Sequence, residues 1–150
     1  MIDGIFVFDN VVHMFNASEE QVIEEDGHDA QEHWLAMTSS GRPHGDNERY
    51  GGETSKYAFA KEWTTEKAWQ MVFRDSDTDL AMAQTVTLWD FWKDGLSSVE
   101  TQYELHKAYP SQVLFCGGVD PGYQSLEECL IQTEFQIEEW GATSMKFYNA

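Results

Sequence analysis

The second half of the chain alternates apolar segments of strand length with segments of helical periodicity. Apolar runs occupy residues 80–89, 113–120 and 143–148. The segments between them, 97–109 and 125–140, each begin with a serine that can cap a helix, either Ser97 or Ser98 in the first and Ser125 in the second. Continuous apolar runs, as opposed to alternating ones, are typical of strands that are covered on both faces. Such strands alternating with helices predict right-handed βαβ units and a parallel sheet.

A first strand is expected over residues 5–15, which are mostly β-branched or aromatic. Residues 16–78 separate this strand from the next one, and a connection of that length is unusual in a compact domain. Within it we expect short helices over residues 19–25 and 30–37, followed by a glycine-rich loop. Residues 1–150 are therefore interpreted as one α/β domain with an insertion at residues 16–78.

Composition and charge exclude several classes of partner. The chain has 27 Asp and Glu against 9 Lys and Arg, a net charge of −18, which opposes binding to nucleic acid or to an anionic membrane surface. No apolar run approaches the roughly 20 residues that cross a bilayer, and Asp3 replaces the basic start of a signal peptide. Cys116 and Cys129 are expected to be buried free thiols. These features predict a soluble, cytoplasmic protein.

Two positions in the predicted strands could carry chemistry. Asp9, Val11 and His13 alternate at the carboxyl end of the first strand, where alternate residues share one face. In a (β/α) barrel that end of the strands holds metal ions and catalytic groups, so Asp9 and His13 are candidate metal ligands. A hydrogen-bonded core histidine is the alternative for His13. Lys146 is either an inward cation that holds a carboxylate or a side chain whose stem packs while its head reaches solvent.

Other polar clusters are weaker candidates. The acidic run at residues 75–79 has the spacing of half a calcium loop, but Leu80 and Val86 stand where that loop needs Gly and Glu, so a solvated turn is expected. No Ser nucleophile elbow, Walker loop or dinucleotide fingerprint is present. Three histidines of the insertion are expected at the surface, with contact to a substrate as the less favoured alternative: His28, His33 and His44.

Two blocks of the chain, residues 3–15 and 79–149, resemble the metal-dependent amidohydrolases. The resemblance is to the amidohydrolase-related group that includes aminocarboxymuconate-semialdehyde decarboxylase. Residues 109–121 and 140–148 are similar to that group's strand ending in v-d-P and to its later l-G-x-x-G-x-K segment. The first strand, which ends in residues 9–13, falls where the family has its D-x-H-x-H metal motif.

The resemblance implies a (β/α)8 TIM-type barrel, of which this chain supplies about the first four strands. It implies a divalent metal, commonly zinc, with His13 matching the second His of the motif and Asp9 its leading Asp. Val11 replaces the first His, so one ligand is lost. The implied activity is that of a hydrolase or a decarboxylase that acts on a small-molecule substrate bearing a carboxylate or an amide, through a metal-activated water. Lys146 would hold a substrate carboxylate.

Two further interpretations remain open. Four strands of eight leave two open edges, so we expect the rest of a barrel or another chain to cover them, and a homo-oligomer is the favoured form. A metal-free barrel piece that serves as a binding or oligomerisation module is the main alternative to an enzyme. An open flavodoxin-like sheet is less favoured, because no glycine-rich phosphate loop follows the first strand.

Overall fold

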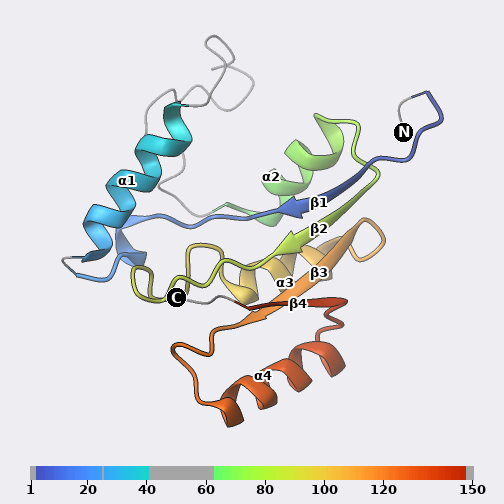
Figure 1. The fold of residues 1–150 in the computed structure, drawn as a ribbon. Coiled ribbons are helices and arrows are strands. Elements are labelled where there is room, and N and C mark those ends of the chain that lie inside the picture. Colours follow the sequence, from blue (N-terminus) through green and yellow to red (C-terminus); the bar gives the residue numbers. More distant parts are fainter. Residues whose placement is uncertain (1–2, 25, 41–62, 148–150) are drawn as a thin grey trace.

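Four parallel strands form one curled sheet in the order β1-β2-β3-β4 (Figure 1). The computed structural model describes residues 3–24, 26–40 and 63–147, and within α1 it leaves out the side chains of residues 35 and 37–40. The strands are β1 (Phe8–Val12), β2 (Leu80–Gln84), β3 (Val113–Val119) and β4 (Ser144–Phe147). The expected parallel α/β sheet is confirmed, and its curvature resembles half of a barrel.

The main helices fall into two groups. Figure 1 shows α2 (Thr65–Trp69) and α3 (Val99–Ala108) behind the sheet and α4 (Leu126–Glu138) below β4. In the same view α1 (Asp26–Ser40) lies beyond the carboxyl ends of the strands. Two short elements complete the chain, a 3-10 helix η1 (Glu19–Gln21) and a π-helical turn η3 (Gln70–Arg74) that continues α2. We call the sheet face opposite α2, α3 and α4 the concave face.

One apolar core joins the sheet to its helices. Met14 follows β1, Ala83 lies on β2 and Val113 on β3, and these side chains pack with Ala68 of α2 and Leu105 of α3. All five are buried, and four of them are less than 2% exposed. Burying large side chains such as Leu or Met contributes about 1.5–3 kcal/mol each, so this cluster stabilises the attachment of α2 and α3.

A second core lies at the carboxyl ends of the strands. Its buried members Ala17, Val86, Trp92 and Leu96 pack with Trp34 of α1. The chain between β2 and α3 is tied there by short antiparallel bridges, Val22 to Trp92 and Val86 to Ser97. This core therefore links α1 and the segment after β1 to the loop after β2.

Most of the predicted helices and strands are present, but several of them begin or end at other residues than predicted. The helix expected at residues 30–37 is confirmed and is longer, whereas the one expected at residues 19–25 is only η1. The strand expected at residues 80–89 ends at Gln84, and further along the backbone turns at Leu88, whose φ is 49°. Helix α2 was not expected from the sequence, although Thr64 caps it by accepting a hydrogen bond from Lys67 N.

The buried side of α4 differs from the one that the apolar spacing predicts. Leu126, Leu130 and Ile137, whose spacing indicates the helix, are 77%, 62% and 47% exposed. The buried residues of α4 are Cys129 and Gln136. Gln136 Oε1 accepts from Gly118 N at 2.9 Å and its Nε2 donates to Gly118 O at 3.1 Å.

Gly117 of β3 explains why α4 buries Gln136 against the sheet. A Cβ atom on Gly117 would lie 2.2 Å from Gln136 Oε1, so only a residue without a side chain lets α4 approach β3 at this point. The bidentate amide contact then satisfies backbone groups that apolar side chains of α4 would leave without partners. Cys116 and Cys129 are both buried free thiols, as expected.

The capping box of α4 gives a test of this fold. Ser125 Oγ accepts from Glu128 N at 3.2 Å, and Ser125 N donates to Glu128 Oε2 at 2.8 Å. We expect Ser125→Ala to lower the free energy of unfolding by about 1 kcal/mol, measured by urea denaturation. The control is Ser111→Ala in the exposed turn before β3, which should change it by less than about 0.5 kcal/mol. Equal losses in both variants would contradict the role of the cap.

Candidate functional site at the carboxyl ends of the strands

His13 follows β1 directly and is half-buried. Its Nδ1 lies 2.7 Å from the backbone oxygen of Gln84, the last residue of β2. A carbonyl oxygen can only accept, so Nδ1 carries the hydrogen and Nε2 of the neutral ring keeps its lone pair. This backbone-oriented tautomer is the arrangement of histidines that bind metals or accept protons.

The surroundings of His13 favour its neutral form. Burial is the main cause that lowers the pKa of His13, and the hydrogen bond to Gln84 offsets part of that effect. The positive charge of Lys146 lowers the pKa further, while the charge of Asp9 raises it. The imidazole is therefore ready to donate its Nε2 lone pair at neutral pH.

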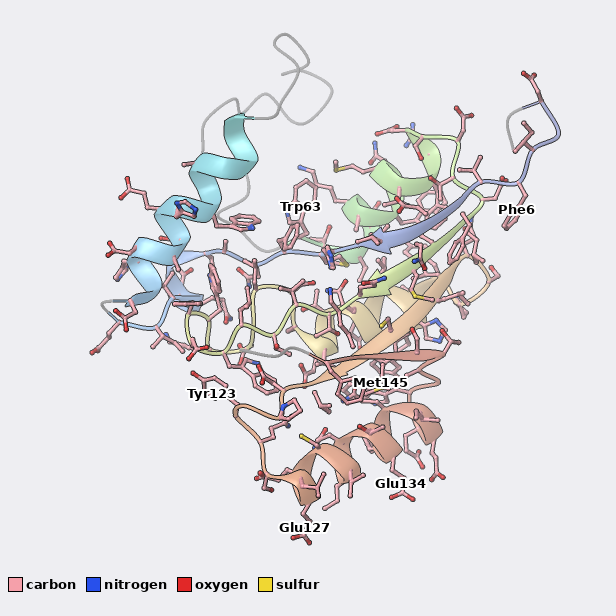
Figure 2. All side chains as sticks on the ribbon, in the orientation of Figure 1. Phe6, Trp63, Tyr123, Glu127, Glu134 and Met145 are labelled. Atoms are coloured by element: carbon pink, nitrogen blue, oxygen red, sulfur yellow. The ribbon has the colours of Figure 1, made fainter. Side chains whose placement is uncertain are left out.

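Lys146 lies on the concave face of β4. A Cβ atom on Gly117 would be 2.9 Å from Met145 Sδ and close to Gln136 of α4, so Met145 (labelled in Figure 2) faces the helices. Successive residues of a strand point to opposite faces, which directs Lys146 to the concave face. Its electrostatic effect on His13 agrees with that placement. The structure thus places His13 and Lys146, two of the three site residues expected from the sequence, on the same face of the sheet, on β1 and β4, with β2 and β3 between these strands.

Asp9 is placed differently. Asp9 pairs with Ala81 and Val12 with Ala83, so β1 advances three residues while β2 advances two. This is a β-bulge, and Val11 N donates to Asp9 Oδ1 at 3.1 Å within it. Ala81 and Ala83, the partners of Asp9 and Val12, are buried on the helix-covered side of the sheet. Because of the bulge, Asp9 and His13 do not share a face by the simple alternation of a strand.

Val11 keeps the position that the alternation predicts. Val12 and Met14 are buried, 8% and 1% exposed, whereas Val11 is 55% exposed and His13 half-buried. Val11 and His13 therefore alternate with core residues beyond the bulge and share the concave face. A side chain at position 11 could consequently act together with the imidazole of His13.

The sequence did not single out Gln84 or Asp120 as site residues. Besides orienting His13, Gln84 donates from Nε2 to the backbone oxygen of Asn10 at 2.6 Å, which joins the ends of β1 and β2. Asp120 directly follows β3 and is 2% exposed. Its carboxylate accepts from Gly122 N at 2.9 Å and from Thr87 Oγ1 at 3.3 Å. Gln84 and Asp120 lie at the edge of the sheet because β2 and β3 end there. The sequence did not predict these strand ends accurately.

The described residues do not complete a metal site. Within residues 3–24, 26–40 and 63–147, no three His, Cys, Asp or Glu side chains come together to hold an ion. A zinc site uses three or four protein ligands, and here His13 is one oriented donor. His28 is exposed and its Nδ1 lies 3.4 Å from Glu19 Oε1, His33 is exposed on α1, and His44 lies outside the described residues. Asp9 and His13 as ligands thus remain a prediction.

The lowered pKa of His13 predicts how stability depends on pH. As pH falls below about 6.5, the unfolded chain takes up a proton that the folded imidazole resists, so folding loses stability. Urea denaturation at pH 7.5 and 5.5 should show a smaller loss on acidification for His13→Gln than for the wild type. His33→Gln, which removes an exposed imidazole, is the control. A steeper loss in His13→Gln would contradict the neutral-imidazole assignment.

Comparison of the chain with protein-family models, curated proteins and solved structures found no match in any of the three. In the described part of the chain, none of the helices has the length and apolar character that crossing a membrane requires. A fold shared by many functions does not identify one of them, so function has to be argued from the side chains at the strand ends.

Proposed function

We propose that the concave face is part of the mouth of a (β/α)8-type barrel and that it binds a small carboxylate-bearing substrate. The observation that supports this most directly is the placement of a neutral, oriented imidazole and an ammonium group on one face, His13 and Lys146. Both lie at the carboxyl ends of parallel strands, the usual place for ligand sites in such sheets.

The two side chains have complementary roles in this proposal. The ammonium group of Lys146 would pair with the carboxylate and so fix the orientation of the substrate. His13 Nε2 would accept a proton, and the Nδ1 hydrogen bond to Gln84 O would strengthen as the ring becomes positive. These roles fit activation of a water or of an acidic substrate group.

The amidohydrolase resemblance extends the proposal to a metal-dependent hydrolase or decarboxylase. A divalent metal, when bound, supplies a water of lowered pKa. His13 offers one ligand, and the remaining ligands would have to come from outside the described residues. Metal-dependent activity is therefore proposed for an assembled barrel and not for the described residues alone.

Carboxylate binding can be tested with a neutral analogue as reference. In NMR titrations we expect benzoate to shift His13 and Lys146 resonances and benzamide to bind more weakly, because only benzoate pairs with the ammonium group. Lys146→Met should weaken benzoate binding roughly 10-fold, since a charged hydrogen bond contributes about 1.5–3 kcal/mol. The control, Lys107→Met, changes a lysine that pairs with Glu104 on α3. Equal binding of benzoate and benzamide would refute the proposed carboxylate site.

Metal binding can be tested through position 11. Val11 and His13 share a face, so Val11→His adds a second imidazole beside the first, and we expect zinc affinity to rise at least about 10-fold by isothermal titration. His13→Gln should remove that gain in the double variant. His28→Gln controls for zinc held at the exposed pair of His28 and Glu19. Unchanged affinity in Val11→His would exclude β1 as a metal-binding strand.

A metal-free binding module is the second candidate. Two observations favour it. Val11 has no metal-ligating atom at the position where the amidohydrolases, which this chain resembles, have a histidine. Among the described residues, His13 is the one oriented metal ligand that the site offers. Retained benzoate binding in protein that elemental analysis shows to be free of divalent metal, together with no zinc uptake, would support this candidate over the enzyme.

A further inference from the structure

Large apolar side chains are exposed at both open edges of the sheet. Beside β1 they form what we call the β1-edge surface, which comprises Ile5, Phe6, Phe8 and Val11, each 43–67% exposed. Beside β4 they form the β4-edge surface, which comprises Leu126, Leu130, Ile137 and Phe147, each 47–77% exposed. Among the described residues, the central elements β2, β3 and α3 carry no such side chain. Most of the exposed large apolar side chains among the described residues therefore lie where the sheet has no next neighbour; the others are Tyr123, Ile131 and Phe135.

Helix α4 turns one specific flank toward the open edge. Gln132 and Gln136 line a cavity of about 530 Å³ shared with the first turn of α3, so this side of α4 faces α3. Glu127 and Glu134 point away from the sheet in Figure 2. At about 100° per residue, the remaining flank is that of Leu126, Leu130 and Ile137, which faces away from α3. This flank is placed to receive a neighbour beyond β4.

We propose that two copies of this chain associate about a twofold axis, with the β4-edge surface of each copy against the β1-edge surface of the other. The described ladders give β1 and β4 one strand partner each, β2 and β3, so each keeps one edge open in the described part of the chain. Two curled sheets of four parallel strands joined in this way would close into an eight-stranded parallel barrel.

A second copy is the occupant that these surfaces favour. The neighbour has to offer a β4-like edge to β1 and a β1-like edge to β4 at the same time, and this chain carries both. Eight half-exposed large side chains present on the order of 700 Å² of apolar surface, taking roughly 180 Å² for each, close to the ~800 Å² per partner of a stable interface. The net charge of −18 opposes self-association, so the pair should tighten as salt screens that repulsion.

Closure would also complete the concave face. At each junction Lys146 of one copy would adjoin the strand of the other copy that carries Val11 and His13. Two equivalent sites would then form, each with side chains from both copies, and the apolar side chains of the concave face would leave water. This assembly does not depend on whether His13 binds a metal.

Sedimentation velocity on the full 150-residue chain, at low and high NaCl, tests the assembly. We expect a species of twice 17.2 kDa whose dissociation constant falls as NaCl rises. Leu130→Glu/Ile137→Glu changes the β4-edge surface and Phe6→Glu/Phe8→Glu the β1-edge surface. Each pair should weaken self-association about 100-fold or more, because carboxylates would be buried at both junctions. Ile131→Glu, on the outward side of α4, is the matched control and should leave the dimer intact.

Mixing the two double variants gives the decisive result. A pair with one copy of each has one junction with both changes and one junction with none, so the mixture should associate more tightly than either variant alone. A dimer through like edges would be broken by one double variant and not by the other, and mixing would not restore it. A chain that stays monomeric at every salt concentration, or a dimer that both double variants leave unchanged, would overturn the proposal. Circular dichroism of each variant checks that the fold is retained.

Discussion

The parallel pairing of β2 with β3 is the interaction on which the other elements depend. Ala81 and Ala83 of β2 lie beside Val113 and Phe115 of β3, and all four are at most 1% exposed. Because these side chains are small on β2 and large on β3, α2 and α3 can pack on one side of the pair. The same pairing sets where each strand ends, and hence which polar groups reach the carboxyl edge.

The candidate site is a consequence of that edge. The backbone oxygen of Gln84 ends β2 and fixes the imidazole of His13, while β4 brings Lys146 to the same face through β3. The contact that orients His13 joins residues far apart in sequence, since His13 and Gln84 are 71 positions apart. The bulge in β1 removes Asp9 from the simple alternation but leaves Val11 and His13 together. A single extra residue in β1 thus decides which of its side chains share a face with His13.

Helix α4 shows why burial could not be predicted from periodicity alone. The spacing of Leu126, Leu130 and Ile137 correctly indicates a helix, yet the face it identifies is exposed. The contact with β3 is decided by Gly117, whose lack of a side chain lets the amide of Gln136 reach the backbone of Gly118. A hydrophobic stripe marks a surface that needs covering, and the sequence does not say whether the cover comes from the same sheet or from another body.

The sequence by itself determined the parallel α/β class, the strand and helix order after residue 80, the caps of α3 and α4, and the burial of both thiols. These follow from local properties, namely apolar runs, capping side chains and glycine or proline breaks. Only the tertiary structure decided the bulge in β1, the tautomer of His13, the inward face of Lys146 and the exposed flank of α4. Each of these depends on which distant strand or helix lies alongside, and spacing along one strand or helix does not contain that information.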